Sequence, residues 1–95
     1  MTDKTIIDGP HARYTVQFII AGYAMPDGRD IQHATSKGQI ADMLKREHEQ
    51  AERYGAAYEP SEALVWIGHH SDVTDVYPDF LFAMGPRGGV HWKLC

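Results

Sequence analysis

The chain has 95 residues, a single cysteine and a formal net charge of −4, and hydrophobic and charged residues make up 43% and 23% of it. This length and composition are typical of one folded globular domain, and they exclude a disordered chain and a disulfide scaffold. The charge balance excludes general DNA or RNA binding, because nucleic-acid binders concentrate Lys and Arg.

We also expect a cytoplasmic protein without a membrane segment. The chain contains no apolar run of about 18 residues, and its first residues lack the basic and apolar regions of a signal peptide. Cys95 has no second cysteine with which to form an internal disulfide, which suits a reducing compartment.

The first part of the chain predicts an arm followed by a hairpin. Residues 1–12 are polar and contain Gly9-Pro10, so we expect a flexible N-terminal arm, with residues 13–95 forming the single α+β domain. Apolar residues then alternate with polar ones, a period of two that predicts a strand with one buried face; they are Tyr14, Val16, Phe18 and Ile20. A turn at Pro26-Asp27-Gly28 and a short return strand near Asp30 to Ala34 complete the predicted hairpin.

An amphipathic helix is predicted from Ser36 to Tyr54. Ser36 and Gln39 have the spacing of a capping box, and Gly55 stands where a left-handed C-terminal cap belongs. The helix has an apolar stripe, which predicts that one face joins the core. The residues of this stripe are Ile40, Met43, Leu44, Ala51 and Tyr54.

Three further strands are predicted after the helix. Ala63 to His69 is a nearly continuous apolar run, as expected for a strand in the middle of a sheet. Phe80 to Met84 and Val90 to Leu94 are joined by a Gly-rich segment, residues 85–89, with the composition of a hairpin connection.

The expected fold is therefore a two-layer α+β sandwich, in which one helix packs on a mostly antiparallel sheet of four to five strands in the order β-β-α-β-β-β. The sheet face away from the helix is also expected to be apolar, through Ile19, Ala21 and Tyr23 of the first strand and Val65 and Ile67 of the third. Two alternatives could cover it: a second copy in a homodimer, or the N-terminal arm together with the loop of residues 70–79.

Glu47 falls in the middle of the apolar stripe of the helix. A buried carboxyl there could act as a general acid or base or as a metal ligand. The structural alternative is that its methylenes pack while its carboxylate reaches polar groups at the edge of the core.

Histidines and aspartates also cluster where the third strand ends, at residues 69–72 and then at Asp75 and Asp79. At most one of His69 and His70 could join a site with His33, His48 or His91, because consecutive residues of a strand point to opposite faces. No HExxH, CxxC or EF-hand spacing is present, so we expect no metal and no other cofactor. The structural alternative is that the aspartates form Asx turns.

Contact with another protein is favoured over catalysis. Residues 54–86 contain five acids and no Lys or Arg, and aromatic side chains stand beside the acids. This mixture is typical of a protein interface that selects a basic partner. The candidate partner-binding residues are Asp72, Asp75, Tyr77, Asp79 and Phe80. The alternative is a small metal-assisted or acid-base enzyme that uses Glu47, His69 and His91, which requires these side chains to converge.

The segment SKGQIADMLKREHEQAERYG followed by EALVWIG, roughly residues 36–68, loosely resembles small uncharacterised accessory proteins of actinobacteria and their phages. The resemblance implies an accessory protein that acts by binding a host factor. It assigns a role to no individual residue.

Overall fold

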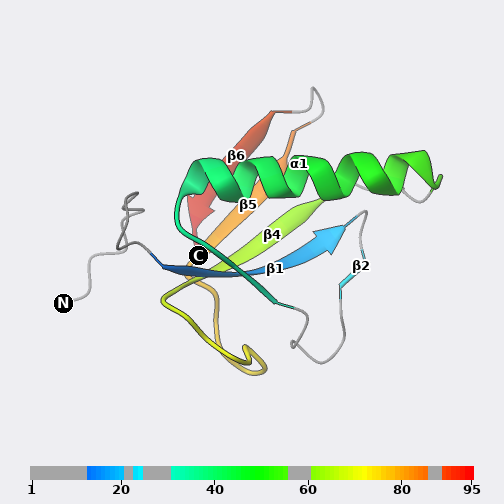
Figure 1. The fold of residues 1–95 in the computed structure, drawn as a ribbon. Coiled ribbons are helices and arrows are strands. Elements are labelled where there is room, and N and C mark those ends of the chain that lie inside the picture. The colour runs from blue at the N-terminus through cyan, green and yellow to red at the C-terminus, as the bar shows by residue number, and fades with distance from the viewer. Residues whose placement is uncertain (1–12, 21–22, 25–30, 56–60, 86–88) are drawn as a thin grey trace.

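The computed structural model describes residues 13–20, 23–24, 31–55, 61–85 and 89–95. They form one helix and one antiparallel sheet (Figure 1). The elements in chain order are β1 (Tyr14–Ile20), β2 (Tyr23–Ala24), β3 (Gln32–Ala34), α1 (Lys37–Arg53), β4 (Glu62–Ile67), β5 (Phe80–Met84) and β6 (Val90–Leu94).

The sheet has the order β2-β1-β4-β5-β6, and β3 also pairs with β1. The predicted return strand near Asp30 to Ala34 is present as β3, which pairs with the beginning of β1. A second piece, β2, lies before the predicted turn and pairs with the end of β1. With these two pieces counted as one strand, the predicted order β-β-α-β-β-β and the α+β class are confirmed. The predicted turn at Pro26-Asp27-Gly28 lies outside the described residues, as does the arm of residues 1–12.

The helix begins and ends close to the predicted residues. Ser36 is the N-cap, and its hydroxyl accepts from the backbone N–H of Gln39 at 3.1 Å. The side chain of Gln39 reaches back one residue further than in the usual capping box and accepts from the N–H of Thr35 at 2.8 Å. At the other end, Gly55 adopts a φ of 70°, the left-handed cap that its lack of a Cβ permits.

The helix packs on one face of the sheet and encloses the core between the two layers (Figure 1). The buried residues of this core are Tyr14, Val16, Ala34, Ile40, Leu44, Ala63, Val65, Phe80 and Phe82. Within the helix only Ile40 and Leu44 are fully buried, and Glu47 and Ala51 are half-buried. The prediction that Tyr54 belongs to the buried stripe is wrong: it caps the helix beyond its last turn and is 80% exposed.

The sheet face away from the helix differs from the prediction. Val65 is buried against the helix, because β4 begins at Glu62 and its register with β1 pairs Val65 with the core residue Val16. Ile67 shares that side, since it pairs with Tyr14. Leu64 and Trp66 therefore occupy the opposite face. Tyr23 does not continue β1, because it belongs to β2 and pairs antiparallel with Ile20; Ala21 lies outside the described residues.

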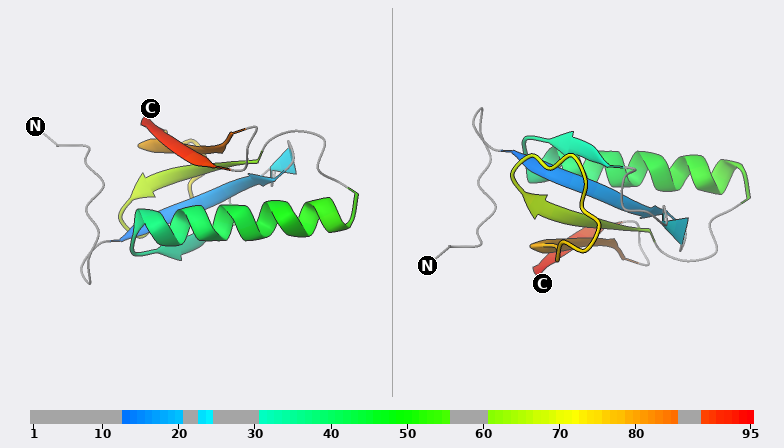
Figure 2. Two further views of the ribbon diagram at one scale, coloured as in Figure 1. Left: turned by 90° about the horizontal axis from the view of Figure 1, so that it is seen from above. Right: turned by 90° about the horizontal axis from the view of Figure 1, so that it is seen from below.

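Part of that opposite face is covered from within the chain. The segment between β4 and β5, residues 68–79, crosses the sheet on the side away from the helix (Figure 2, right, yellow). Thr15 and Trp66, whose side chains lie on that side, are buried. The sequence offered two alternatives for covering this face, a homodimer or an internal segment. For the part around Thr15 and Trp66, the internal segment of residues 68–79 provides the cover.

Candidate functional site

The segment between β4 and β5, residues 68–79, is called the acidic loop here, and its first end is fixed to β1. Gly68 has a φ of 93°, which only glycine adopts without strain, and its N–H donates to the carbonyl oxygen of Arg13 at 2.8 Å. The hydroxyl of Thr15 donates to the carbonyl oxygen of Gly68 at 2.7 Å and accepts from the N–H of His70 at 2.9 Å. One buried hydroxyl therefore joins the start of the loop to the sheet.

The middle of the acidic loop is fixed through a tryptophan. The indole Nε1–H of Trp66 donates to the carbonyl oxygen of Val76 at 2.9 Å, and Trp66 itself is buried. Val73 is also buried, and its carbonyl oxygen accepts from the N–H of Val76 at 3.1 Å, closing a turn. The loop therefore has a packed inner side even though it lies outside the sheet.

Asp79 closes the loop and connects three strands. Its Oδ2 accepts from the N–H of Ile67 at 2.9 Å, and its own N–H donates to the carbonyl oxygen of Val65 at 2.8 Å. Its carbonyl oxygen accepts from the N–H of Cys95, just beyond β6, at 3.1 Å. The sequence predicted Asp79 as a partner-binding residue, but in the structure its carboxylate accepts a hydrogen bond from β4 and holds the end of the loop there.

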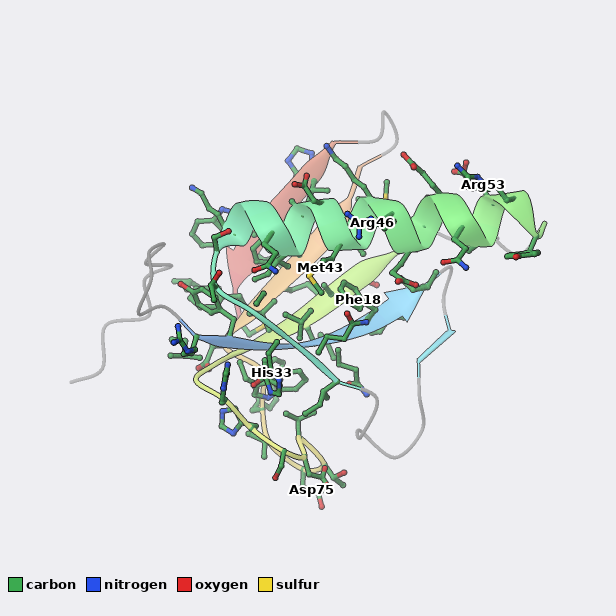
Figure 3. All side chains as sticks on the ribbon, viewed as in Figure 1. Phe18, His33, Met43, Arg46, Arg53 and Asp75 are labelled. Carbon is green, nitrogen blue, oxygen red and sulfur yellow. The ribbon has the colours of Figure 1, made fainter. Side chains whose placement is uncertain are left out.

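The outer side of the acidic loop carries the remaining predicted contact residues. Asp72 accepts from the N–H of Thr74 at 2.8 Å, the Asx turn that was the structural alternative for this residue. Asp75 has a φ of 64° and lies at the tip of the loop, on the side of the sheet away from Met43 and Arg46 of the helix (Figure 3). Tyr77 is 84% exposed, and the neighbouring Val76, which the sequence did not single out, is 42% exposed.

Phe80 requires a correction. The sequence grouped it with Tyr77 as an exposed aromatic contact, but Phe80 is fully buried in β5 against the helix. The acidic stretch of residues 54–86 includes both the loop and β5. Because β5 begins at Phe80 and its side chains alternate between the two faces of the sheet, the side chain of Phe80 points into the core. Phe80 therefore supports the fold and cannot contact a partner in this conformation.

The residues of the alternative enzyme site are not gathered. Glu47 is half-buried on the helix. His91 lies on β6 opposite Ala83, which in turn pairs with Glu62, so His91 is on the sheet face away from the helix. His69 instead contacts His33, with ring centroids 4.3 Å apart and planes at 41°. Within the described part of the chain, no three His, Cys, Asp or Glu side chains form a group that could hold a metal ion.

The contact between His33 and His69 was not anticipated, because it depends on the register that places His33 of β3 opposite Thr15. The Nε2–H of His33 donates to the carbonyl oxygen of His70 at 3.1 Å, which holds the ring against the start of the acidic loop. Desolvation, together with the positive charges that His33 and Arg13 can present, lowers the pKa of His69 below its ordinary value of 6.5.

A second histidine contact joins the helix to the sheet. Nδ1 of His48 lies 2.7 Å from the hydroxyl oxygen of Ser61, and its Nε2 lies 3.0 Å from a carboxylate oxygen of Glu52. A serine, a histidine and a carboxylate that contact one another in this order have the composition of a nucleophilic triad. Here, however, Ser61 is fully buried and the carboxylate is the exposed member, so the hydroxyl cannot meet a substrate and the contact stabilises the helix on the sheet.

Comparisons with known protein families, with curated proteins and with solved structures found no match to this chain. The described residues include no helix that is long and apolar enough to span a membrane.

Proposed function

We propose that the protein is a small non-enzymatic binding module that attaches to another protein through the outer side of the acidic loop. The observation that carries the proposal is Tyr77, a large aromatic side chain that is 84% exposed on a loop fixed at both ends and in the middle. Exposed tyrosines on pre-ordered backbone supply much of the binding energy at protein interfaces, because little conformational freedom is lost on binding.

The charge around Tyr77 supports a basic partner. Asp72 and Asp75 are exposed in the same loop, and no Lys or Arg occurs between residues 54 and 86. Arg13 beside the start of the loop and Lys93 on the same sheet face are basic, but the loop itself contains no Lys or Arg, and its acidic groups attract a partner of the opposite sign. A protein with a cluster of Lys and Arg is the partner that this loop fits.

The sheet next to the loop extends this surface. Ile19, Leu64 and Leu81 lie on the face away from the helix and are half-buried, so their apolar atoms remain partly available. Leu64 and Leu81, which pair with each other, supply apolar area together with Val76, and Ile19 continues this area toward the far end of β4, opposite Glu62. An apolar centre with a charged rim is the usual composition of an interface.

An inhibitory or accessory role toward a host factor is the form of this proposal that agrees with the resemblance to actinobacterial and phage proteins. The single cysteine agrees with action in the cytoplasm. The chemistry of the loop supports the class of partner, namely a basic protein, rather than any particular one.

The test is affinity capture from a lysate of the organism that encodes the protein, with matched single substitutions. Tyr77→Ala should abolish retention of a specific protein, since removal of a central aromatic contact typically costs about 2 kcal/mol or more, roughly thirty-fold in Kd. Tyr54→Ala is the matched control, because Tyr54 is 80% exposed at the far end of the helix. Asp75→Asn, which retains a side chain tolerant of the left-handed conformation, should weaken binding mainly at low salt.

The proposal fails if no protein is retained by the wild-type chain, or if Tyr77→Ala and Tyr54→Ala retain the same proteins equally well. Far-UV circular dichroism of each variant would show that the fold is intact. The captured protein should also bind in purified form with one-to-one stoichiometry.

A further inference from the structure

The strand β6 ends the sheet on the side away from β1, and its outer edge pairs with none of the described strands. Its residues are exposed or half-buried along its whole length. Natural proteins usually protect such an edge, because its free N–H and C=O groups form a template for another strand. Between residues 89 and 95 this edge carries no proline and no acidic residue, and its one lysine, Lys93, stands on the sheet face away from the helix.

The hydrogen bonds of the β5–β6 hairpin show which backbone groups face outward. Gly85 N–H donates to the carbonyl oxygen of Gly89 at 2.7 Å, and Cys95 N–H donates to that of Asp79 at 3.1 Å. Backbone groups of an antiparallel strand point alternately to its two sides. Because Gly89 and Cys95 both bond toward β5 across an unbroken register, Val90, Trp92 and Leu94 direct their N–H and C=O groups to the open edge.

The same three residues carry the apolar side chains of the edge. Trp92 lies opposite Phe82 and Leu94 opposite Phe80, so both side chains are on the helix side of the sheet. The Trp92 ring stacks on Phe82 with centroids 6.4 Å apart and meets Phe80 edge-on at 5.7 Å. These contacts order the ring, yet Trp92 remains 42% exposed and Leu94 53% exposed.

The helix leaves part of this apolar row uncovered, because Val90 packs against the core while Trp92 and Leu94 remain partly exposed. α1 packs against β1, β3, β4 and β5, and Figure 2 (left) shows β6 at the opposite margin of the sheet from the helix. In β6, therefore, the residues whose backbone N–H and C=O groups face outward are also those with apolar side chains on the helix side. The geometry of that combination fits a second extended strand with its own apolar row.

We propose that β6 pairs antiparallel with β6 of a second copy of this chain, forming a two-fold symmetric dimer with a continuous sheet. A two-fold axis at Trp92 places Val90 opposite Leu94 of the second copy and the two Trp92 residues opposite each other. The outward groups of the three residues then form about six hydrogen bonds between the copies. The apolar side chains of both copies meet on the helix side.

Symmetry identifies a second copy as the occupant, and the absence of acidic residues from β6 keeps the net charge of −4 away from the contact. The basic residues Lys93 and His91 project to the other face, where the two-fold axis places Lys93 of each copy opposite His91 of the second copy. A contact between identical strands is also self-complementary and closes at two copies. The opposite edge of the sheet consists of the short pieces β2 and β3, which offer a poor partner for β6.

The dimer is independent of the proposed function, because the acidic loop lies on the other face of the sheet. Each dimer would present two acidic loops. A basic partner with two binding surfaces would then be held more strongly than by one copy alone.

The experiment is sedimentation velocity over a range of concentrations in the presence of a reductant, so that Cys95 cannot link two chains. The wild-type chain should reach twice the 10.7 kDa mass of one chain. Leu94→Pro removes one outward N–H while leaving the β5–β6 hydrogen bonds in place, and Leu94→Ala keeps that N–H. The proline should raise the dimer dissociation constant at least about tenfold more than alanine does.

A second disruptive variant, Leu94→Lys, retains the backbone N–H and places a charge in the apolar seam, so it tests the proposal even if the proline variant does not fold. Tyr77→Ala should leave the dimer unchanged, which separates this proposal from that for the acidic loop. A wild-type chain that remains monomeric at millimolar concentration overturns the proposal. A dimer that survives both Leu94→Pro and Leu94→Lys also overturns it.

Discussion

Thr15→Val tests whether one hydroxyl holds the acidic loop on the sheet. Thr15 is fully buried, and its hydroxyl bonds both to Gly68 and to His70. Valine has nearly the same shape, so the substitution removes the two hydrogen bonds and leaves packing almost unchanged. The expected result is a less stable protein whose loop opens more often.

The magnitude follows from the two bonds. Each intramolecular hydrogen bond contributes about 0.5–1.5 kcal/mol net, so the expected loss is about 1–3 kcal/mol. Gly68 and His70 are only half-buried, so water can reach the freed groups once the loop moves, which limits the loss to this range. For a domain of this size each kcal/mol corresponds to a decrease in Tm of about 4–8 °C.

The assays are urea unfolding followed by circular dichroism and hydrogen exchange at the His70 amide, the group that donates to Thr15. Thr15→Ser is the control, because it keeps the hydroxyl and loses a buried methyl group, at a cost of about 1 kcal/mol. Exchange at His70 should accelerate in the valine variant and not in the serine variant. Wild-type protection at His70 together with a stability change below about 0.5 kcal/mol in Thr15→Val would refute the reasoning.

Three further outcomes are expected. Leu44→Ala should lower the free energy of unfolding by about 2–5 kcal/mol, because Leu44 is fully buried between helix and sheet; a urea-unfolding loss below about 1 kcal/mol would contradict this. Gly55→Ala should destabilise by about 1 kcal/mol, because the added Cβ meets open space but φ is 70°; equal Tm values for the two proteins would show that the cap is not strained. Because the pKa of His69 is lowered in the folded protein, the unfolded chain binds a proton more readily, and the free energy of unfolding should decline as pH falls through and below 6.5. His69→Gln should reduce this decline. Equal slopes of the free energy of unfolding against pH for the two proteins would contradict the prediction.

The local elements followed from the sequence because their signals are short-range. The capping residues Ser36 and Gln39 lie within one helical turn of each other, and Gly55 provides its cap through its own backbone. The alternation in β1 depends on residues two positions apart. With one helix among several strands, a two-layer α+β sandwich was the economical packing, and the structure has that architecture.

The candidate surface was predicted less well. Tyr77 was identified correctly as exposed, because it lies in a polar loop away from any strand. Phe80 was misplaced, and the structural role of Asp79 was missed, because both depend on where β5 starts and which strands it joins. Glu47, His69 and His91 do not converge, because the sheet separates Glu47 from His91. The sequence alone does not show on which face of the sheet His91 lies.

By itself, then, the amino-acid sequence determined the kinds of element in this protein, their order and the ends of its helix, since these depend on neighbours a few positions apart. Only the tertiary structure decided which face of β4 is buried, because an uninterrupted apolar run such as Leu64-Val65-Trp66 has no period from which to choose a side. It also decided the contacts between His33 and His69 and between His48 and Ser61. Each of these joins residues from different elements, and strand register and helix placement, which arise from packing of the whole chain, bring them together.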